Sequence, residues 1–280
     1  MIFKTPRQLK DKIRNEERKH NLPANTLINY YMMERFICKI SESKYKDNFI
    51  IKGGFLISSL IGIDMRSTMD MDTTIKGIAV SEESIVKIMH EIIEIDLGDN
   101  IGWEIEKIRP IHEEGGYEDF RITLIAKFFN MEVAVKLDIT TGDTIIPKEV
   151  DYEYLLLFSD EKIDIKAYPL DTILAEKIET ILTRNVLNTR ARDYYDLYIL
   201  TKLNPDLDYN KLSKAVKTKS IERNSLGYIE ESKRYYKEIA SSEDLKNIWE
   251  NYRNKHSYSE NINWEDVLKT LESTLKKISI

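Results

Sequence analysis

Two aspartates separated by a single residue are the first feature of this chain whose spacing could support chemistry. Asp70 and Asp72 lie in the extended-looking segment STMDMDTTIKG. Residues two apart on a strand point to the same face, so both carboxylates would face one spot. Two such charges are unfavourable without a cation between them, and Mg²⁺ binds through one or two carboxylates plus phosphate oxygens. The pair predicts a metal site, although an Asp-x-Asp can also line an ordinary exposed strand.

A third carboxylate comes from a later strand-like segment. NMEVAVKLDITTG alternates so that Lys136 and Asp138 share the face opposite to Val135 and Leu137. A third acid could complete a two-metal site, in which ions roughly 4 Å apart stabilise the attacking and leaving oxygens of a displacement. It could also help to deprotonate an acceptor hydroxyl. A structural role for Asp138, as a capping acid before ITTG, stays open.

Two consecutive glycines could bind phosphate. Gly53 and Gly54 stand between a predicted strand and a predicted helix. Bare backbone N–H groups at a helix N-terminus make an anion site that a triphosphate would fit, although the glycines could simply allow a tight turn. We expect the cations Lys52, Arg66 and Lys136 to help bind the nucleotide, with a surface role as the alternative.

A lysine and two aspartates mark the helical second half. Lys177 lies within or at the edge of an apolar helix stripe that starts at Leu170, where an ammonium needs an anionic partner. Asp193 and Asp196 are three residues apart and share a helix face, where they repel each other unless a cation offsets their charge. Lys177 is a candidate counter-ion. A catalytic role and a structural salt-bridge cluster are both open.

The apolar periodicity predicts an α+β protein in two parts. Residues 1–165 are expected to hold helices at 24–41 and 81–97, a strand, turn, helix and strand around 49–75, and strands at 103–113, 117–129 and 130–142. Residues 166–280 are expected to be helical, with helices near 170–184, 190–202, 209–219, 226–240, 242–254 and 264–278.

Composition and missing motifs exclude several classes of protein. No stretch approaches the roughly 20 apolar residues of a membrane span, and the charged N-terminus does not fit a signal peptide, so we expect a cytoplasmic protein. One cysteine, Cys38, cannot form an internal disulfide framework. Walker A, GxGxxG and zinc-ligand spacings are missing, and His90-Glu91 matches only the first half of HExxH.

Charge is distributed unevenly along the chain. The net charge of −6 argues against indiscriminate binding of nucleic acid. Residues 211–237, however, hold eight Lys or Arg against three Glu, and residues 138–164 hold eight acids against two Lys. These segments can be two solvated surfaces, or a metal-binding half and a half that grips a polyanion.

Five motifs taken together resemble the AbiEii/AbiGii-type nucleotidyltransferase toxins of bacterial abortive-infection systems. In order they are KGG (52–54), RSTMDMD (66–72), KLD (136–138), DTILAEK (171–177) and RDYYDL (192–197). Order and spacing agree from residue 50 to about residue 200, whereas the last 80 residues match only in being helical. Lys52 replaces an apolar residue before the glycines, and the fifteen residues 55–69 make a long interval, so the phosphate loop departs from the family pattern.

The resemblance implies a polymerase-beta-like nucleotidyltransferase core with the hG[GS]…DxD pattern on Gly53, Gly54, Asp70 and Asp72, and a helical lobe that closes over the nucleotide. It implies Mg²⁺, a nucleoside triphosphate donor and an RNA acceptor, the 3′ end of tRNA, whose modification would stop translation during phage defence. Lys177 and Asp196, with Asp193, match the family's essential lysine and aspartate. A cognate antitoxin encoded alongside is implied, whereas a stable complex with it is not implied.

These observations predict a specific set of site residues and leave two alternatives. The predicted catalytic residues are Asp70, Asp72, Asp138, Lys177 and Asp196, of which the first three bind metal. The predicted nucleotide-binding residues are Lys52, Gly53, Gly54, Arg66, Lys136 and Asp193. One alternative is a transferase that modifies a protein or small molecule. The other is an RNA-binding protein without turnover, which would not need three chelating acids.

Overall fold

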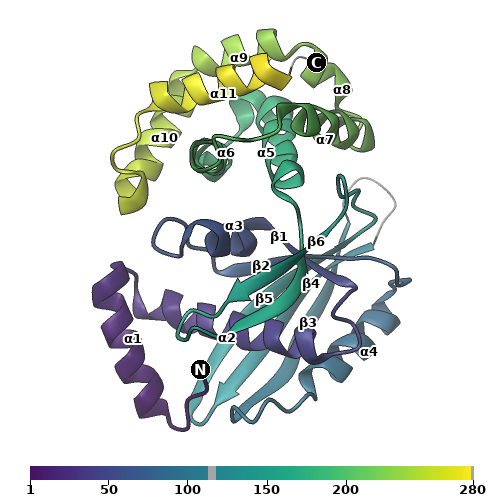
Figure 1. The fold of residues 1–280 in the computed structure, drawn as a ribbon, viewed down its shortest axis with the longest axis vertical. Helices are drawn as coiled ribbons and strands as arrows, with labels where there is room; N and C mark the ends of the chain where they lie inside the picture. Colours follow the sequence, from purple (N-terminus) through teal and green to yellow (C-terminus); the bar gives the residue numbers. More distant parts are fainter. Residues whose placement is uncertain (113–117, 279–280) are drawn as a thin grey trace. The chain divides into compact units, whose positions relative to one another are not determined.

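The computed structural model describes residues 1–112 and 118–278, and the chain divides into two compact units (Figure 1). Unit 1 consists of Met1–Asp143 and Glu149–Ala167, and unit 2 consists of Thr144–Lys148 and Tyr168–Ile280. Glu113 and Tyr117, at the ends of two predicted strands, lie outside the described residues. That residues 1–165 form a nucleotidyltransferase domain and residues 166–280 a separate helical domain stays a prediction.

Unit 1 is built on a mixed sheet. The strand order is β3-β4-β5-β2-β1-β7-β6, and the pairs β2/β5 and β1/β7 are parallel whereas the remaining pairs are antiparallel. The predicted α+β class is confirmed. The elements of unit 1 are α1 (Pro6–His20), α2 (Ala24–Glu42), β1 (Phe49–Lys52), α3 (Gly53–Ile61), β2 (Asp70–Ile75), α4 (Glu82–Ile93), β3 (Ile101–His112), β4 (Glu118–Phe128), β5 (Met131–Thr141), β6 (Val150–Leu155) and β7 (Lys162–Ala167).

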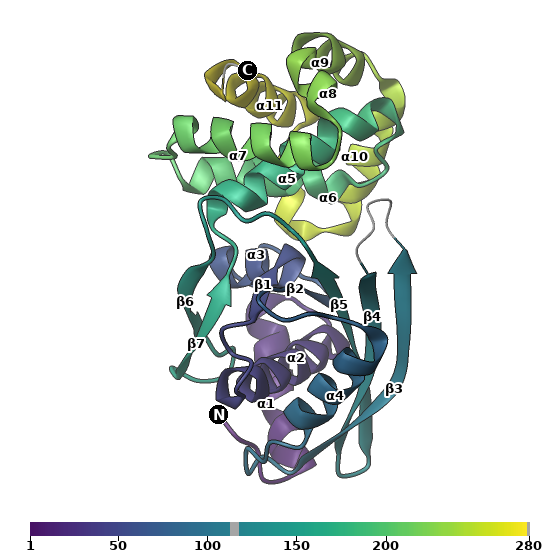
Figure 2. The ribbon, with the colours of Figure 1, turned by 90° about the vertical axis from the view of Figure 1, so that its right-hand side faces the viewer.

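One face of strands β3, β4 and β5 is buried and the other is polar. On β5, Val135, Leu137 and Ile139 are fully buried, whereas Lys136 between them is exposed. Helices α2 and α4 cover the apolar side (Figure 2), and a capping box between Ser81 and Ser84 fixes the start of α4. The alternation predicted from the sequence is therefore the alternation of the folded strand, and it leaves the polar side available for a site.

Unit 2 is helical in its described residues. The predicted helices are confirmed within a few residues of their bounds, except that the helix expected at 226–240 is two helices separated at Glu231, where φ is −93° and ψ is 20°. The elements are α5 (Leu170–Arg184), η1 (Asn185–Leu187), α6 (Ala191–Leu203), α7 (Tyr209–Glu222), α8 (Leu226–Glu230), α9 (Ser232–Ala240), α10 (Glu243–Lys255), η2 (Ser257–Ser259) and α11 (Trp264–Ile278).

Three elements of unit 1 were not predicted because charged residues hide their apolar pattern. Helix α1 buries little more than Leu9 and Ile13, which are one helical turn apart in an otherwise polar segment. Strands β6 and β7 alternate charged with apolar residues and form cross-strand ion pairs, such as Lys162 with Glu153 at 2.8 Å. The acidic stretch 138–164 therefore includes the edge of the sheet.

Candidate active site

The three predicted aspartates lie side by side on two neighbouring strands. In the parallel pair β2/β5, Asp72 is directly beside Asp138, and Asp70 is directly beside Lys136. Residues opposite each other on adjacent strands point to the same face of the sheet. The structure thus brings Asp70, Asp72 and Asp138 together on the polar face, which we call the aspartate face.

Cations flank the aspartates on both sides. Lys52 of β1 is the cross-strand neighbour of Asp72, and Arg121 of β4 is the neighbour of Asp138. Four adjacent strands therefore present Lys52, Asp72, Asp138 and Arg121 in one row. Arg121 was not predicted as a site residue, because alternation within EDFRITL places it on the polar face but cannot show which residue lies beside it.

Arg121 holds the Asp138 carboxylate with two hydrogen bonds. Its Nε donates to Oδ1 at 2.7 Å and its Nη2 donates to Oδ2 at 2.6 Å. The hydrogen bond and the charge of Asp138 raise the pKa of the Arg121 guanidinium, and Asp70 and Asp72 add smaller contributions of the same sign. Arg121 therefore lies within electrostatic reach of all three aspartates and orients one of them.

The two glycines have different roles. A Cβ on Gly53 would lie 2.0 Å from Oδ2 of Asp72, and φ of Gly53 is +64°, a left-handed conformation that favours glycine. A Cβ on Gly54 would meet Arg66 Nη2 and Thr68 Oγ1 at 3.1 Å, with no such backbone restriction. Gly53 therefore lets the start of α3 approach the Asp72 carboxylate, and Gly54 packs against Arg66.

The predicted nucleotide-binding cations have different surroundings. Lys52, the cross-strand neighbour of Asp72, donates hydrogen bonds to Asp143 at 2.5 Å and to Thr140 at 2.6 Å. Arg66 is buried, with 4% of its surface exposed, and donates to the carbonyl of Ser67 at 2.6 Å. Lys136 is exposed beside Asp70. Lys136 is thus the most accessible of the three for a ligand.

The aspartates fit a divalent cation, but not as a preassembled trio. In residues 1–112 and 118–278, no group of three or more His, Cys, Asp or Glu side chains is arranged to hold an ion. Arg121 donates hydrogen bonds to both oxygens of Asp138. Asp70 is exposed and Asp72 half-buried on one strand face, and Mg²⁺ needs only one or two carboxylates besides phosphate oxygens and water. The pair therefore suits a hard cation, with Asp138 available once Arg121 releases it.

Lys177, Asp193 and Asp196 form a buried cluster in unit 2. The Lys177 ammonium lies 2.8 Å from Asp193 and 2.9 Å from Asp196, and the Asp196 side chain has no exposed surface. Burial lowers the pKa of Lys177, but the charges of Asp196 and Asp193 outweigh burial and raise it above its ordinary value. Lys177 is therefore protonated and held in place. Its pairing with Asp193 and Asp196 agrees with the counter-ion role predicted from the sequence.

Much of the basic segment 211–237 is neutralised within unit 2. Lys219 is fully buried, 3.3 Å from Glu176 and 3.4 Å from Glu222. Arg223 pairs with Glu179 at 2.7 Å and Arg234 with Glu231 at 2.8 Å. The charge count from the sequence therefore overstates the positive surface of these helices.

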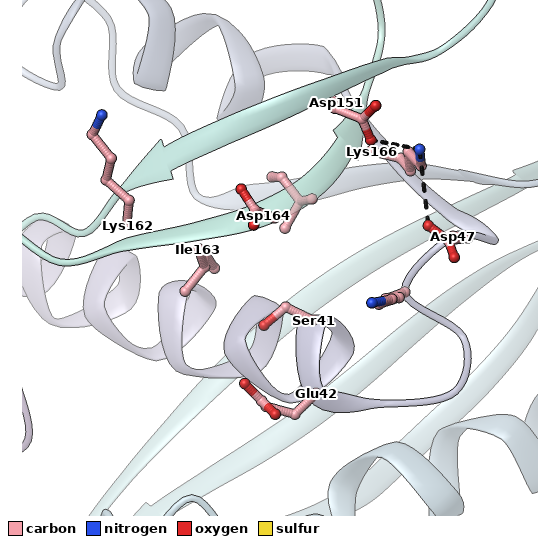
Figure 3. A pocket seen from close by; sticks show the side chains of 10 residues that line it. Ser41, Glu42, Asp47, Asp151, Lys162, Ile163, Asp164 and Lys166 are labelled. Atoms are coloured by element: carbon pink, nitrogen blue, oxygen red, sulfur yellow. Dashed lines mark hydrogen bonds and ion pairs between the residues drawn. The ribbon is translucent and has the colours of Figure 1, made fainter.

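Two hollows of unit 1 differ in their relation to the aspartates. The groove between the end of α2 and strand β7, about 340 Å³ in volume, has charges that pair with one another, such as Lys166 with Asp151 at 2.5 Å (Figure 3). None of the predicted site residues lines it. A cavity of about 660 Å³ lies at the carboxyl ends of β2 and β5 and is lined by Thr74 and Asp143. Thr74 follows Asp72 on the same strand face, roughly 7 Å along β2, so this cavity adjoins the aspartate face.

A match to a protein-family model identifies the family of this chain. Residues 35–271 match the family described as nucleotidyl transferase AbiEii toxin, type IV toxin-antitoxin system. The chain belongs to this AbiEii family. The match spans the strands that carry the aspartates as well as the helices that carry Lys177, Asp193 and Asp196. Membership makes the chain a nucleotidyltransferase toxin with a nucleoside triphosphate as substrate, and it implies a cognate antitoxin.

Solved structures with a similar fold are distant in sequence. A candidate nucleotidyltransferase from H. pylori is 15% identical with a TM-score of 0.49, over 92% of this chain and 96% of that chain. JHP933 from Helicobacter pylori is 15% identical with a TM-score of 0.48, over 92% and 93% of the two chains. An antigenic nucleotidyltransferase-like protein from Paracoccidioides brasiliensis is 15% identical with a TM-score of 0.41, over 70% and 90%. The AbiEii assignment rests on the family match alone.

No curated protein matches the chain in sequence. Among the described residues, none of the helices combines the length and the apolar character that crossing a lipid bilayer requires.

Proposed function

We propose that this AbiEii-family protein transfers a nucleoside monophosphate from a nucleoside triphosphate to the 3′ end of an RNA, with tRNA as the acceptor and Mg²⁺ as the metal. Blocking the tRNA end would stop translation, which suits a toxin that acts in the cytoplasm during phage defence. The row Lys52, Asp72, Asp138 and Arg121 is the observation that supports this proposal, because it places two adjacent carboxylates between two cations on one sheet face.

The proposed reaction is an in-line displacement at the α-phosphorus. The 3′-hydroxyl oxygen forms a bond to phosphorus, the bond from phosphorus to the bridging oxygen of the β-phosphate breaks, and pyrophosphate leaves with that electron pair. Asp138 accepts the hydroxyl proton after Arg121 has released one of its oxygens. Asp70 and Asp72 would hold the metal, which supplies positive charge to the attacking and leaving oxygens.

The nucleotide would use the surroundings of the aspartates. The start of α3 at Gly53 offers backbone N–H groups to phosphate oxygens, and Lys136 beside Asp70 adds a positive charge. The cavity next to Thr74 is within the usual range for small-molecule sites, about 300–1,000 Å³, and would hold the nucleoside part. The catalytic roles of Lys177 and Asp196, which the family motif implies, stay a prediction.

A labelling experiment tests this proposal directly. The purified protein is incubated with Mg²⁺, each α-³²P-labelled nucleoside triphosphate and total tRNA, beside an Asp70→Asn/Asp72→Asn variant. Label in RNA that depends on the aspartates supports the proposal and identifies the donor. Label only in protein or in a small molecule would replace RNA by another acceptor, and no transfer to any acceptor would favour a binding function.

A further inference from the structure

The polar face of the sheet carries a group of basic side chains beyond the aspartates. Arg109 of β3 is the cross-strand neighbour of Arg121, which in turn lies beside Asp138. Lys107 of β3 lies opposite Thr123 of β4, which lies opposite Lys136. Lys107, Arg109, Arg121 and Lys136 therefore share one face of three adjacent strands, which we call the basic face.

A β-bulge places two of these residues on that face. The register of β3 against β4 shifts between Ile105 and Lys107, so Glu106 is the extra residue. With an unbroken alternation, Glu106 would point to the side of the aspartates and Lys107 would point to the core. Because of the bulge, Lys107 and Arg109 lie on the aspartates' side and Ile108 takes a core position. Bulges beside active sites commonly re-aim side chains in this way.

The basic face is exposed, and most of its charge is not neutralised. Lys107, Arg109 and Lys136 are exposed, and in the described part of the chain no acidic side chain forms an ion pair with them. Arg121 keeps 55% of its side chain exposed while it binds Asp138. Like charges opposite each other on neighbouring strands are destabilising, and Asp138 is the anion that lies against Arg121, whereas Arg109 has no such partner among the described residues.

The same sheet face has a contrasting region further along the strands. Lys127 of β4 lies 2.6 Å from Glu104 and 4.0 Å from Glu132, so its charge is offset within the sheet. Free positive charge is thus concentrated at the end of β3, β4 and β5 that lies beside the aspartates. This distribution fits a chain of phosphates that approaches the aspartates over the basic face.

We propose that the basic face binds the phosphodiester backbone of the acceptor strand and leads its 3′ end to Asp70, Asp72 and Asp138. This inference rests on the proposed transfer to a nucleic acid. Strands β5 to β3 span roughly 10 Å, so side chains from all three can contact neighbouring phosphates of one strand. Contacts to the backbone position a nucleic acid without selecting its sequence.

The test uses a variant of β3, which two strands, β4 and β5, separate from the aspartate pair of β2. Lys107→Gln/Arg109→Gln removes two cations without touching the predicted site residues. Fluorescence anisotropy with a labelled single-stranded RNA that has a free 3′-hydroxyl measures the affinity at several salt concentrations. We expect about ten-fold weaker binding at moderate salt and a salt slope reduced by about 1.4, since each phosphate contact contributes about 0.7 for a single strand.

Steady-state kinetics separate this surface from the reaction itself. In the variant, KM for the RNA acceptor rises about ten-fold, whereas KM for the nucleoside triphosphate and kcat stay unchanged. Lys127→Gln is the matched control on the same sheet face, and Lys214→Gln/Lys217→Gln tests the helices of unit 2. Thermal unfolding of each variant within about 2 °C of the wild type shows that folding is intact.

Each outcome decides between the two proposals. Wild-type transfer to RNA together with unchanged affinity and KM in the β3 variant would overturn the basic face and leave the proposed function. A loss of RNA binding in that variant, with no transfer by the wild type to RNA, would retain the surface and overturn the function. Binding lost only in the unit 2 variant, or binding of duplex RNA but not of single-stranded RNA or DNA, would also contradict the docking of a single strand here.

Discussion

The aspartate face of unit 1 and the Lys177 cluster of unit 2 both join carboxylates to a cation, but in opposite surroundings. The Arg121 and Asp138 side chains are 55% and 21% exposed, whereas Asp193 and Asp196 are 8% and 0% exposed. An exposed pair is worth little and can exchange its partner, but removing one member of a buried pair leaves an uncompensated charge. The comparison therefore separates a site that can accept a new cation from a cluster that must keep its own.

The largest effect on activity is expected from replacing the two aspartates of β2 on the aspartate face. In Asp70→Asn/Asp72→Asn, nucleotidyl transfer should fall by at least about 10³-fold, the scale of losing a group that stabilises transition-state charge. The melting temperature should stay within about 2 °C or rise, because repulsion between the two carboxylates disappears. Labelling assays and thermal unfolding measure the two effects. A large loss of stability would show that the pair supports the fold.

The opposite pattern is predicted for the buried cluster. Lys177→Met leaves Asp193 and Asp196 buried without their cation, which should lower the free energy of unfolding by about 3–5 kcal/mol. Calorimetry would record a melting temperature lower by roughly 6–20 °C. Lys177→Arg keeps the charge and is the control for stability. If Lys177→Met melts like the wild type and only activity is lost, then Lys177 acts on the substrate and is not a structural counter-ion.

The two adjacent glycines allow a sharper test within the aspartate face. Gly53→Ala places a Cβ 2.0 Å from the Asp72 carboxylate and forces a left-handed backbone on alanine, at a cost of about 1–2 kcal/mol. Asp72 must move, so transfer should fall about 10²-fold. Gly54→Ala meets Arg66 and Thr68 at 3.1 Å and should affect transfer much less. Equal loss in both variants would mean that the glycines serve the phosphate loop together.

Local patterns in the sequence predicted much of this molecule. Alternation along NMEVAVKLDITTG placed Lys136 and Asp138 on the polar face, and apolar periodicity placed the helices of unit 2. Both are properties of a single segment, so they can be read from neighbouring residues. The Lys177 pairing was predictable for a related reason, since an ammonium at the edge of an apolar stripe needs an acid nearby.

Pairing between strands was not predictable in this way. That Asp72 lies beside Asp138, and that Arg121 and Arg109 continue the row, depends on register, which a shift of one residue would reverse. The bulge at Glu106 is invisible in the sequence pattern for the same reason. Strands β6 and β7 were missed because their charged residues pair across the sheet, and the pairing makes acidic and basic positions compatible with a strand.

The smallest effect, and the one that tests the exchange of cations most directly, is predicted for Arg121→Gln. Loss of the guanidinium frees both oxygens of Asp138 and removes one positive charge next to Asp70 and Asp72. At an effective dielectric constant near 80, as for exposed charges, and a separation of about 6 Å, a divalent cation and one unit charge repel each other by about 1.4 kcal/mol, so Mn²⁺ or Mg²⁺ should bind about ten-fold more tightly.

Calorimetric titration of the protein without nucleotide measures this affinity independently of activity. In the Asp138→Asn background, the same Arg121→Gln change should tighten binding less, because the carboxylate that Arg121 holds is no longer present. Weaker metal binding in Arg121→Gln would instead mean that Arg121 helps the metal by orienting Asp138. The Arg121–Asp138 pair would then be a fixed part of the site, and the metal would not displace the Arg121 guanidinium from it. In that case, the aspartate face and the Lys177 cluster would differ only in burial.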